Sequence, residues 1–493
     1  RSALAANTTG AQNVAVGKDA LLANTTADNN TAVGYHSLDA NTTGSENTAV
    51  GMNALGANTT GSSNTVMGVN ALTNNTTASN NTSIGRSTLS QNTTGHSHTA
   101  VGYAALESNT TGNENSAFGF QALNGNTTGE GNTGLGRKSL FTNSTGGQNV
   151  AVGQGALLAN TTASENVAVG YDAMVSNTTG ADNVAVGYHA LDANTTGSNN
   201  TSIGYDSLSG NTTASNNTAL GYEALKASTT ASENVAIGAQ SMLSTTTGGD
   251  NTALGQVSLK SNTTGVSNVA IGRKALQDAT TANQNTAVGT SAMENVTTGS
   301  ENTSVGFQSL DANTTGGSNV AVGHSAMSSN TTASENTAVG KSALASTTTG
   351  SNNTAIGKGA LGANSTGSEN VAVGQDALDA NTTGASNTAL GRASLSAATT
   401  ANGNTGVGES ALRFNTTGEG NTAVGASSAD ALTTGTNSTA VGHNALTSAT
   451  TSSFNTVLGK SAGEAITTGA GNIAIGYNAL DEMTTGSSNV AIG

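Results

Sequence analysis

The stretch NTTGSENTAVG, Asn41–Gly51, decides the fold, because near-copies of it run through the whole chain. Asn13, Asn30 and Asn47 each precede a short run that ends in Ala-Val-Gly, and they lie 17 residues apart. Cut at this spacing, the 493 residues divide into 29 units without remainder, since 29 × 17 = 493. The consensus is x-x-A-L-x-A-N-T-T-G-S-x-N-T-A-V-G, and we number its repeat positions 1 to 17 from Arg1. So strict a period predicts an array in which each unit contacts mainly its neighbours.

The composition favours a solenoid and argues against several other classes of protein. The chain has 65 Gly but no Pro, Cys or Trp. Because Pro removes a hydrogen-bond donor from a strand, its absence suits a chain of paired strands and tight turns. Without Cys there is neither a disulfide framework nor a thiolate metal site. The net charge of −15 argues against nucleic acid as a partner, since phosphates are bound by clustered Lys and Arg, and no apolar run is long enough to insert into a membrane.

Several repeat positions accept few residue types. Position 17 is Gly in all 29 units, which indicates a positive φ or a backbone approach with no room for Cβ. Position 16 is always apolar, and position 9 is always Thr. Position 4 is Leu or Met except at Ala429 and Gly463, and position 13 is Asn except at His98 and Ser438. A helix is excluded because apolar positions 4, 14 and 16 form no stripe of period 3.6.

We therefore predict an all-β, parallel β-solenoid (β-roll) of 29 coils with 17 residues per coil, as a single uninterrupted array over residues 1–493. Each coil is expected to hold a strand at positions 13–16 with positions 14 and 16 inward, a corner at 17, and a second strand at positions 2–6. Asn side chains at position 13 would form a hydrogen-bonded column. At about 4.8 Å per coil the rod would be about 140 Å long. The first and last units are ordinary, so we expect an uncapped segment of a longer fibre.

The string N-x-A-[VIL]-G followed by small residues resembles the head repeats of trimeric autotransporter adhesins, where N-S-V-A-I-G motifs build a left-handed parallel β-roll. The 17-residue form NTAVGYxAL…NTTG is also similar to repeats of phage tail-fibre and bacterial surface-fibre proteins. The resemblance implies a left-handed roll, a homotrimer, and a location outside the cell, on a cell surface or on a virion. The adhesin unit is shorter, and the extra residues around N-T-T-G are a departure from it.

Asn at position 7 begins an Asn-x-Thr acceptor sequence for N-linked glycans in nineteen units. The alternative is a turn or a stacked column of Asn, which we favour because Leu432, Ile466 and Met483 replace Asn in three other units. The nineteen candidates are Asn7, Asn24, Asn41, Asn58, Asn75, Asn92, Asn109, Asn126, Asn143, Asn160, Asn177, Asn194, Asn211, Asn262, Asn313, Asn330, Asn364, Asn381 and Asn415.

All seven Tyr lie at position 1, together with nine of the fourteen Lys and Arg. Tyr171, Tyr188, Tyr205 and Tyr222 occupy consecutive units and are expected to stack as a ladder along one edge. Such an edge could bind sugar or an adjoining fibre, or it could simply cover a corner or a subunit seam.

Neither catalysis nor a metal site finds support in the sequence. The six His are scattered, with His96 and His98 as the only close pair, and no repeat position holds Asp regularly enough for a calcium roll. We expect no enzyme activity and no cofactor.

The sequence thus predicts a structural extracellular fibre or stalk, stiffened by hydrogen-bond ladders along its axis. Self-association is expected, as a homotrimer or end to end. The main alternative is an adhesin that binds glycan, matrix or another cell-surface ligand along the rod edge. Further alternatives are an amyloid-like fibre and an ice-binding protein, but placing position 14 inward leaves no outward Thr-x-Thr pair for ice.

Overall fold

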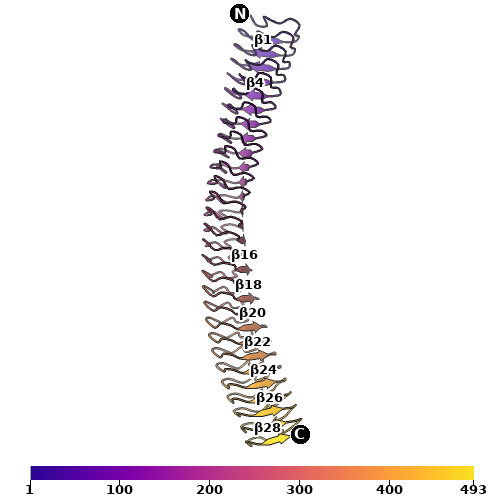
Figure 1. Ribbon diagram of the computed structural model, residues 1–493, viewed down its shortest axis with the longest axis vertical. Coiled ribbons are helices and arrows are strands. Elements are labelled where there is room, and N and C mark those ends of the chain that lie inside the picture. The colour runs from indigo at the N-terminus through magenta and orange to yellow at the C-terminus, as the bar shows by residue number, and fades with distance from the viewer. Residues whose placement is uncertain (1) are drawn as a thin grey trace. The chain divides into compact units, whose positions relative to one another are not determined.

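The computed structural model describes residues 2–493, which divide into two compact units, residues 2–249 and 250–493. In each unit every 17-residue repeat contributes one three-residue strand, and these strands stack in parallel (Figure 1). Paired residues differ by one repeat: Val167 pairs with Val184, and Val169 with Val186. The described residues contain no helix. The predicted all-β, parallel β-solenoid with 17 residues per coil is confirmed.

The strands begin and end at the same repeat positions, 14 and 16, throughout. Those of the first unit are β1 Val14–Val16, β2 Thr31–Val33, β3 Thr48–Val50, β4 Thr65–Met67, β5 Thr82–Ile84, β6 Thr99–Val101, β7 Ser116–Phe118, β8 Thr133–Leu135, β9 Val150–Val152, β10 Val167–Val169, β11 Val184–Val186, β12 Thr201–Ile203, β13 Thr218–Leu220 and β14 Val235–Ile237. Those of the second unit are β15 Thr252–Leu254, β16 Val269–Ile271, β17 Thr286–Val288, β18 Thr303–Val305, β19 Val320–Val322, β20 Thr337–Val339, β21 Thr354–Ile356, β22 Val371–Val373, β23 Thr388–Leu390, β24 Thr405–Val407, β25 Thr422–Val424, β26 Thr439–Val441, β27 Thr456–Leu458, β28 Ile473–Ile475 and β29 Val490–Ile492.

The side chain that each strand buries is the small one at position 15. Ala49 is fully buried, whereas Thr48 and Val50 on either side of it are not. The prediction that positions 14 and 16 face inward was therefore wrong. The reason is the narrow interior: a Cβ added at Gly134, a position 15 residue, would lie 3.3 Å from Cγ of Leu123 in the same coil. Leu at position 4 fills most of the space, so position 15 holds Ala, Gly or Ser, and nothing larger than Val, as at Val66 and Val457.

The predicted second strand at positions 2–6 is absent, because this segment forms turns. Residues at positions 2, 4 and 12 have positive φ even where they are not Gly, as at His36 (50°), Leu38 (54°) and Glu46 (63°). A left-handed Leu costs about 1–2 kcal/mol. Complete burial of the Leu38 side chain contributes roughly 1.5–3 kcal/mol and offsets that cost.

The large core side chain can move from position 4 to position 7 of the same coil. Where position 4 is Ala429, position 7 is Leu432, and where position 4 is Gly463, position 7 is Ile466. Leu432 and Ile466 are fully buried. A Cβ added at Gly463 would lie 3.0 Å from Cδ1 of Ile466, so Ile466 occupies the space that Leu fills elsewhere.

The invariant Gly at position 17 needs both a special backbone conformation and an empty Cβ position. Its φ lies between 128° and 144° in every coil. At Gly187 (φ 141°) an added Cβ would lie 2.4 Å from the carbonyl oxygen of Gly204 in the next coil. Position 10 is also tight, yet the chain itself places Ala there, for example Ala163 and Ala214.

We expect Gly187→Ala to destabilise its part of the solenoid by about 2–4 kcal/mol, because it adds backbone strain to a clash between backbones. Gly180→Ala, at position 10 of the same coil, is the matched control: its Cβ would also meet a backbone oxygen, that of Gly197 at 2.2 Å, but it needs no positive φ and other coils accept Ala there, so it should cost less. Hydrogen exchange of the amides in β10–β12 measures the difference. Equal loss of protection in the two variants would contradict this explanation of the invariant Gly.

Candidate functional site

The Asn side chains of position 7 form a buried hydrogen-bonded column. Nδ2 of Asn41 donates to Oδ1 of Asn24 in the preceding coil (3.1 Å) and to the carbonyl oxygen of Gly44 (2.8 Å). Nδ2 of Asn58 donates to Oδ1 of Asn41 (2.9 Å) in the same way. The column thus closes the N-T-T-G turn and joins successive coils.

Of the nineteen glycan acceptor candidates, only Asn7 is exposed, and the other eighteen are fully buried. An N-linked glycan would attach to Nδ2, which in Asn24 and its counterparts already donates within the column. Folded coils therefore have neither space nor a free nitrogen for a glycan at the buried positions. This burial supports the alternative interpretation of the motif as a stacked Asn column.

A second buried column runs through position 13, as the sequence suggested. Oδ1 of Asn30 accepts a bond from the backbone N–H of Asn47 (3.0 Å) and one from its Nδ2 (3.2 Å). Nδ2 of Asn47 also donates to the carbonyl oxygen of Gly61 in the next coil (2.9 Å). Each Asn therefore links three consecutive coils.

His98 replaces Asn in this column and is 1% exposed. Its Nδ1 accepts a bond from the backbone N–H of Asn115 (3.1 Å), and its Nε2 lies 3.1 Å from Nδ2 of Asn109. Since Nδ1 must accept, the folded coil holds the neutral ring. Burial lowers the pKa of His98 from 6.5 to about 4. The His96–His98 pair does not converge on one site: His96 is exposed, and its Nδ1 contacts the hydroxyl of Ser97 (3.2 Å).

The structure brings Tyr171, Tyr188, Tyr205 and Tyr222 together. Their ring centroids lie 5.3, 5.2 and 5.5 Å apart in sequence order, with interplanar angles of 10°, 5° and 15°. His189 stacks on Tyr188 with a centroid distance of 4.0 Å. The rings face one another, so it is their edges that remain open to solvent.

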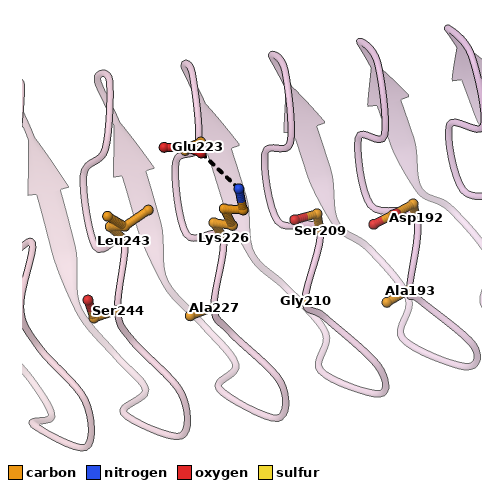
Figure 2. Close-up of a pocket in the computed structure, with 9 residues that line it drawn as sticks. All are labelled: Asp192, Ala193, Ser209, Gly210, Glu223, Lys226, Ala227, Leu243 and Ser244. Atoms are coloured by element: carbon orange, nitrogen blue, oxygen red, sulfur yellow. Dashed lines mark hydrogen bonds and ion pairs between the residues drawn. The ribbon is translucent and has the colours of Figure 1, made fainter.

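An open groove of about 660 Å³ lies beside this ladder, lined by positions 2, 5 and 6 of successive coils (Figure 2). Nζ of Lys226 bridges Oδ2 of Asp206 (2.9 Å) and Oε1 of Glu223 (2.8 Å). The hydrogen bond from Lys226 lowers the pKa of Glu223, while burial raises the pKa of Asp192. Leu243 adds an apolar contribution to the groove. The groove offers paired charges and some apolar surface.

Two histidines share an acidic setting that the sequence reasoning missed. Nδ1 of His36 lies 2.7 Å from Oδ2 of Asp39, and its Nε2 lies 3.6 Å from Oδ2 of Asp19. His189 has Asp192 and Asp172 in the corresponding places, at 3.7 and 4.0 Å. The shared sequence Y-H-x-L-D could have revealed this arrangement. Residues at positions 2 and 5 meet because the turn between them is left-handed.

Comparison with known proteins does not identify a family: no protein-family model matches the chain, and a search of curated proteins found no significant match. Among residues 2–493, no group of three or more His, Cys, Asp or Glu is arranged to hold a metal ion. The same residues include no helix long and apolar enough to cross a membrane.

Protonation of His98 should weaken the coils around it in acid. Its pKa is lower in the folded chain than the usual 6.5, so the unfolded chain binds the proton more tightly. The stability that the neutral His98 contributes is fully present above pH 6.5 and decreases as the pH drops toward 4. The total decrease in the free energy of unfolding is about 3 kcal/mol. Hydrogen exchange in β5–β7 at pH 7, 5.5 and 4 measures this loss. We expect His98→Asn to remove it.

The matched control is His96→Gln, which changes an exposed ring two residues away and should leave the pH dependence as it is. If hydrogen exchange in His98→Asn depends on pH in the same way as in the unmodified chain, protonation of His98 does not cause the loss of stability in acid.

Proposed function

We propose that this chain is a structural, extracellular fibre element of a bacterial surface or a virion, whose copies associate laterally through one face. That face, here called the strand face, consists of the outward side chains at positions 14 and 16. The observation that carries the proposal is its chemistry: in 29 strands it holds no charged residue. The resemblance of the repeat to fibre and adhesin-head repeats supports the location.

The strand face is uncharged and open to solvent in the single chain. Position 16 is apolar in every coil, and position 14 is Thr, Val, Ser or Ile. Leu135, Leu254 and Leu390 are between 44% and 48% exposed. In each unit, large apolar side chains recur in the solvent at position 16, and exposed apolar surface of this kind marks sites of association.

A second copy of this chain is the partner that fits the strand face. All 29 acidic and 14 basic residues lie at other repeat positions, so two copies can meet there without burying a charge. The net charge of −15 stays at the edges, where solvent screens it. The same coil spacing on both copies would let side chains interdigitate along the contact.

Ice binding is a weaker candidate, although position 14 faces outward and not inward as expected, because position 16 is never Thr and no outward Thr-x-Thr pair results. Thr at position 14 faces outward, so a Thr column does lie on the surface. Its neighbours at position 16 differ widely in size, with Met67, Phe118 and Val152 among them. A face of such uneven height does not repeat as an ice lattice requires, whereas a protein partner can adapt to it.

Charges placed on the strand face should dissociate the copies. We expect Ile203→Lys combined with Leu220→Lys to raise the dissociation constant about 100-fold or more, because unpaired charges would be buried. Light scattering after size exclusion should then give the single-chain mass, 47.8 kDa. The control, Thr196→Lys with Thr213→Lys, adds the same charge at exposed positions off the face and should keep the larger mass. An unmodified chain that is itself monomeric at micromolar concentration refutes the association.

An adhesin is the second candidate, favoured by the stacked tyrosines and the adjacent groove. A glycan array probed with the assembled chain separates the two functions. A passive fibre gives no ligand above background. An adhesin that uses this edge binds at least one glycan on the array. That binding should fall at least tenfold in the variant Tyr188→Ser with Tyr205→Ser and should not change in the variant Tyr35→Ser.

A further inference from the structure

The four stacked tyrosines form the longest aromatic run in the described part of the chain. Tyr171, Tyr188, Tyr205 and Tyr222 lie at position 1 of successive coils. The ring planes of neighbouring tyrosines are within 15° of parallel. The centroids of neighbouring rings lie 5.2 to 5.5 Å apart. Tyr35, Tyr103 and Tyr477 have no Tyr in the adjoining coils: Tyr103 stacks on Phe120 instead.

We propose that Tyr171–Tyr222 is a site of oxidative cross-linking, at which dityrosine bonds staple neighbouring coils within one chain. The rings are between 43% and 50% exposed, so an oxidant reaches them and each ring can turn about its side-chain bonds. The chain has no Cys or Trp to intercept a radical. The ladder holds two phenols close together within one chain. Coupling therefore needs only a small rotation of the side chains, not an encounter between two molecules.

The chemistry needs a one-electron oxidant of the peroxidase class with hydrogen peroxide. Each of two phenols loses one electron and one proton to become a phenoxyl radical. The radicals join through the ring carbons next to the hydroxyl, and each of these carbons then releases its proton to restore the aromatic ring while the phenoxyl oxygen regains one. In total, two phenols lose two electrons and two protons, and these reduce one hydrogen peroxide to two waters.

A staple here would add a covalent bond between coils that are otherwise held by hydrogen bonds, an ion pair and packing. The four rings allow two separate bonds, Tyr171 to Tyr188 and Tyr205 to Tyr222, or one central bond between Tyr188 and Tyr205. Such bonds would keep adjacent coils in register under load, which deepens the proposed structural role. The geometry that carries this inference lies within one chain and does not depend on lateral association.

The test treats the purified full chain, at low concentration, with a haem peroxidase and limiting hydrogen peroxide. A protease that cleaves at acidic residues separates the four tyrosines, because Asp182, Asp192 and Asp206 lie between them. Mass spectrometry should find peptides joined through neighbouring ladder tyrosines at least tenfold more often than through Tyr35, Tyr103 or Tyr477. On a denaturing gel the cross-linked product should run as a single chain.

The variant Tyr188→Phe with Tyr205→Phe keeps the stack but leaves no two neighbouring phenols, and Phe already occurs at this repeat position in Phe120 and Phe307. We expect the intrachain dityrosine fluorescence of this variant to be at least tenfold lower than that of the unmodified chain. The control variant, Tyr35→Phe with Tyr103→Phe, should keep the fluorescence of the unmodified chain. Bonds spread evenly over all seven tyrosines, or formed mainly between chains, overturn the proposal. The light-scattering mass reports lateral association separately, so failure of either idea is recognised on its own.

Discussion

The structure depends on buried amide groups that hydrogen-bond to the same repeat position one coil away, where the partner is nearly always another Asn. In the position 13 column Oδ1 of Asn47 accepts from the backbone N–H and from Nδ2 of Asn64, both at about 3 Å. An apolar replacement would leave these buried donors unsatisfied, at about 1–3 kcal/mol each. No other residue presents an acceptor and two donors with that shape. This demand, met at each turn, explains why so bland a sequence is repeated so faithfully.

Features that involve the same position of successive coils could be predicted from the sequence. The invariant Gly, the Asn column of position 13 and the stack that begins at Tyr171 are of this kind, because a period of one coil places each residue above its own copy. The replacement of Asn by an apolar residue at position 7 in some coils, as at Leu432, likewise indicated that this column is buried. In all these cases the periodicity alone supplies the contact.

Features that depend on the path of the chain within a coil could not be predicted. Left-handed backbone at Leu38 or Glu46 is invisible in the sequence, since residues other than Gly rarely adopt it. These turns remove the expected second strand and bring position 2 next to position 5, where His36 meets Asp39. They also narrow the interior until it accepts one Leu per coil, so the larger strand residues turn outward. The usual assumption that bulky apolar side chains lie inside therefore failed.

The outward strand residues carry a restriction that the single chain does not explain. Positions 14 and 16 supply 2 × 29 = 58 side chains, and none is charged, whereas nearby turns hold residues such as Asp206 and Lys226 freely. A strand face open to water normally becomes polar. Position 14 is Thr or Val in all strands but two, Ser116 and Ile473; Thr and Val share a shape but differ in polarity, so shape is what is retained at this position. Retained shape at position 14, together with exclusion of charge from both positions, is what packing against a second protein surface would impose.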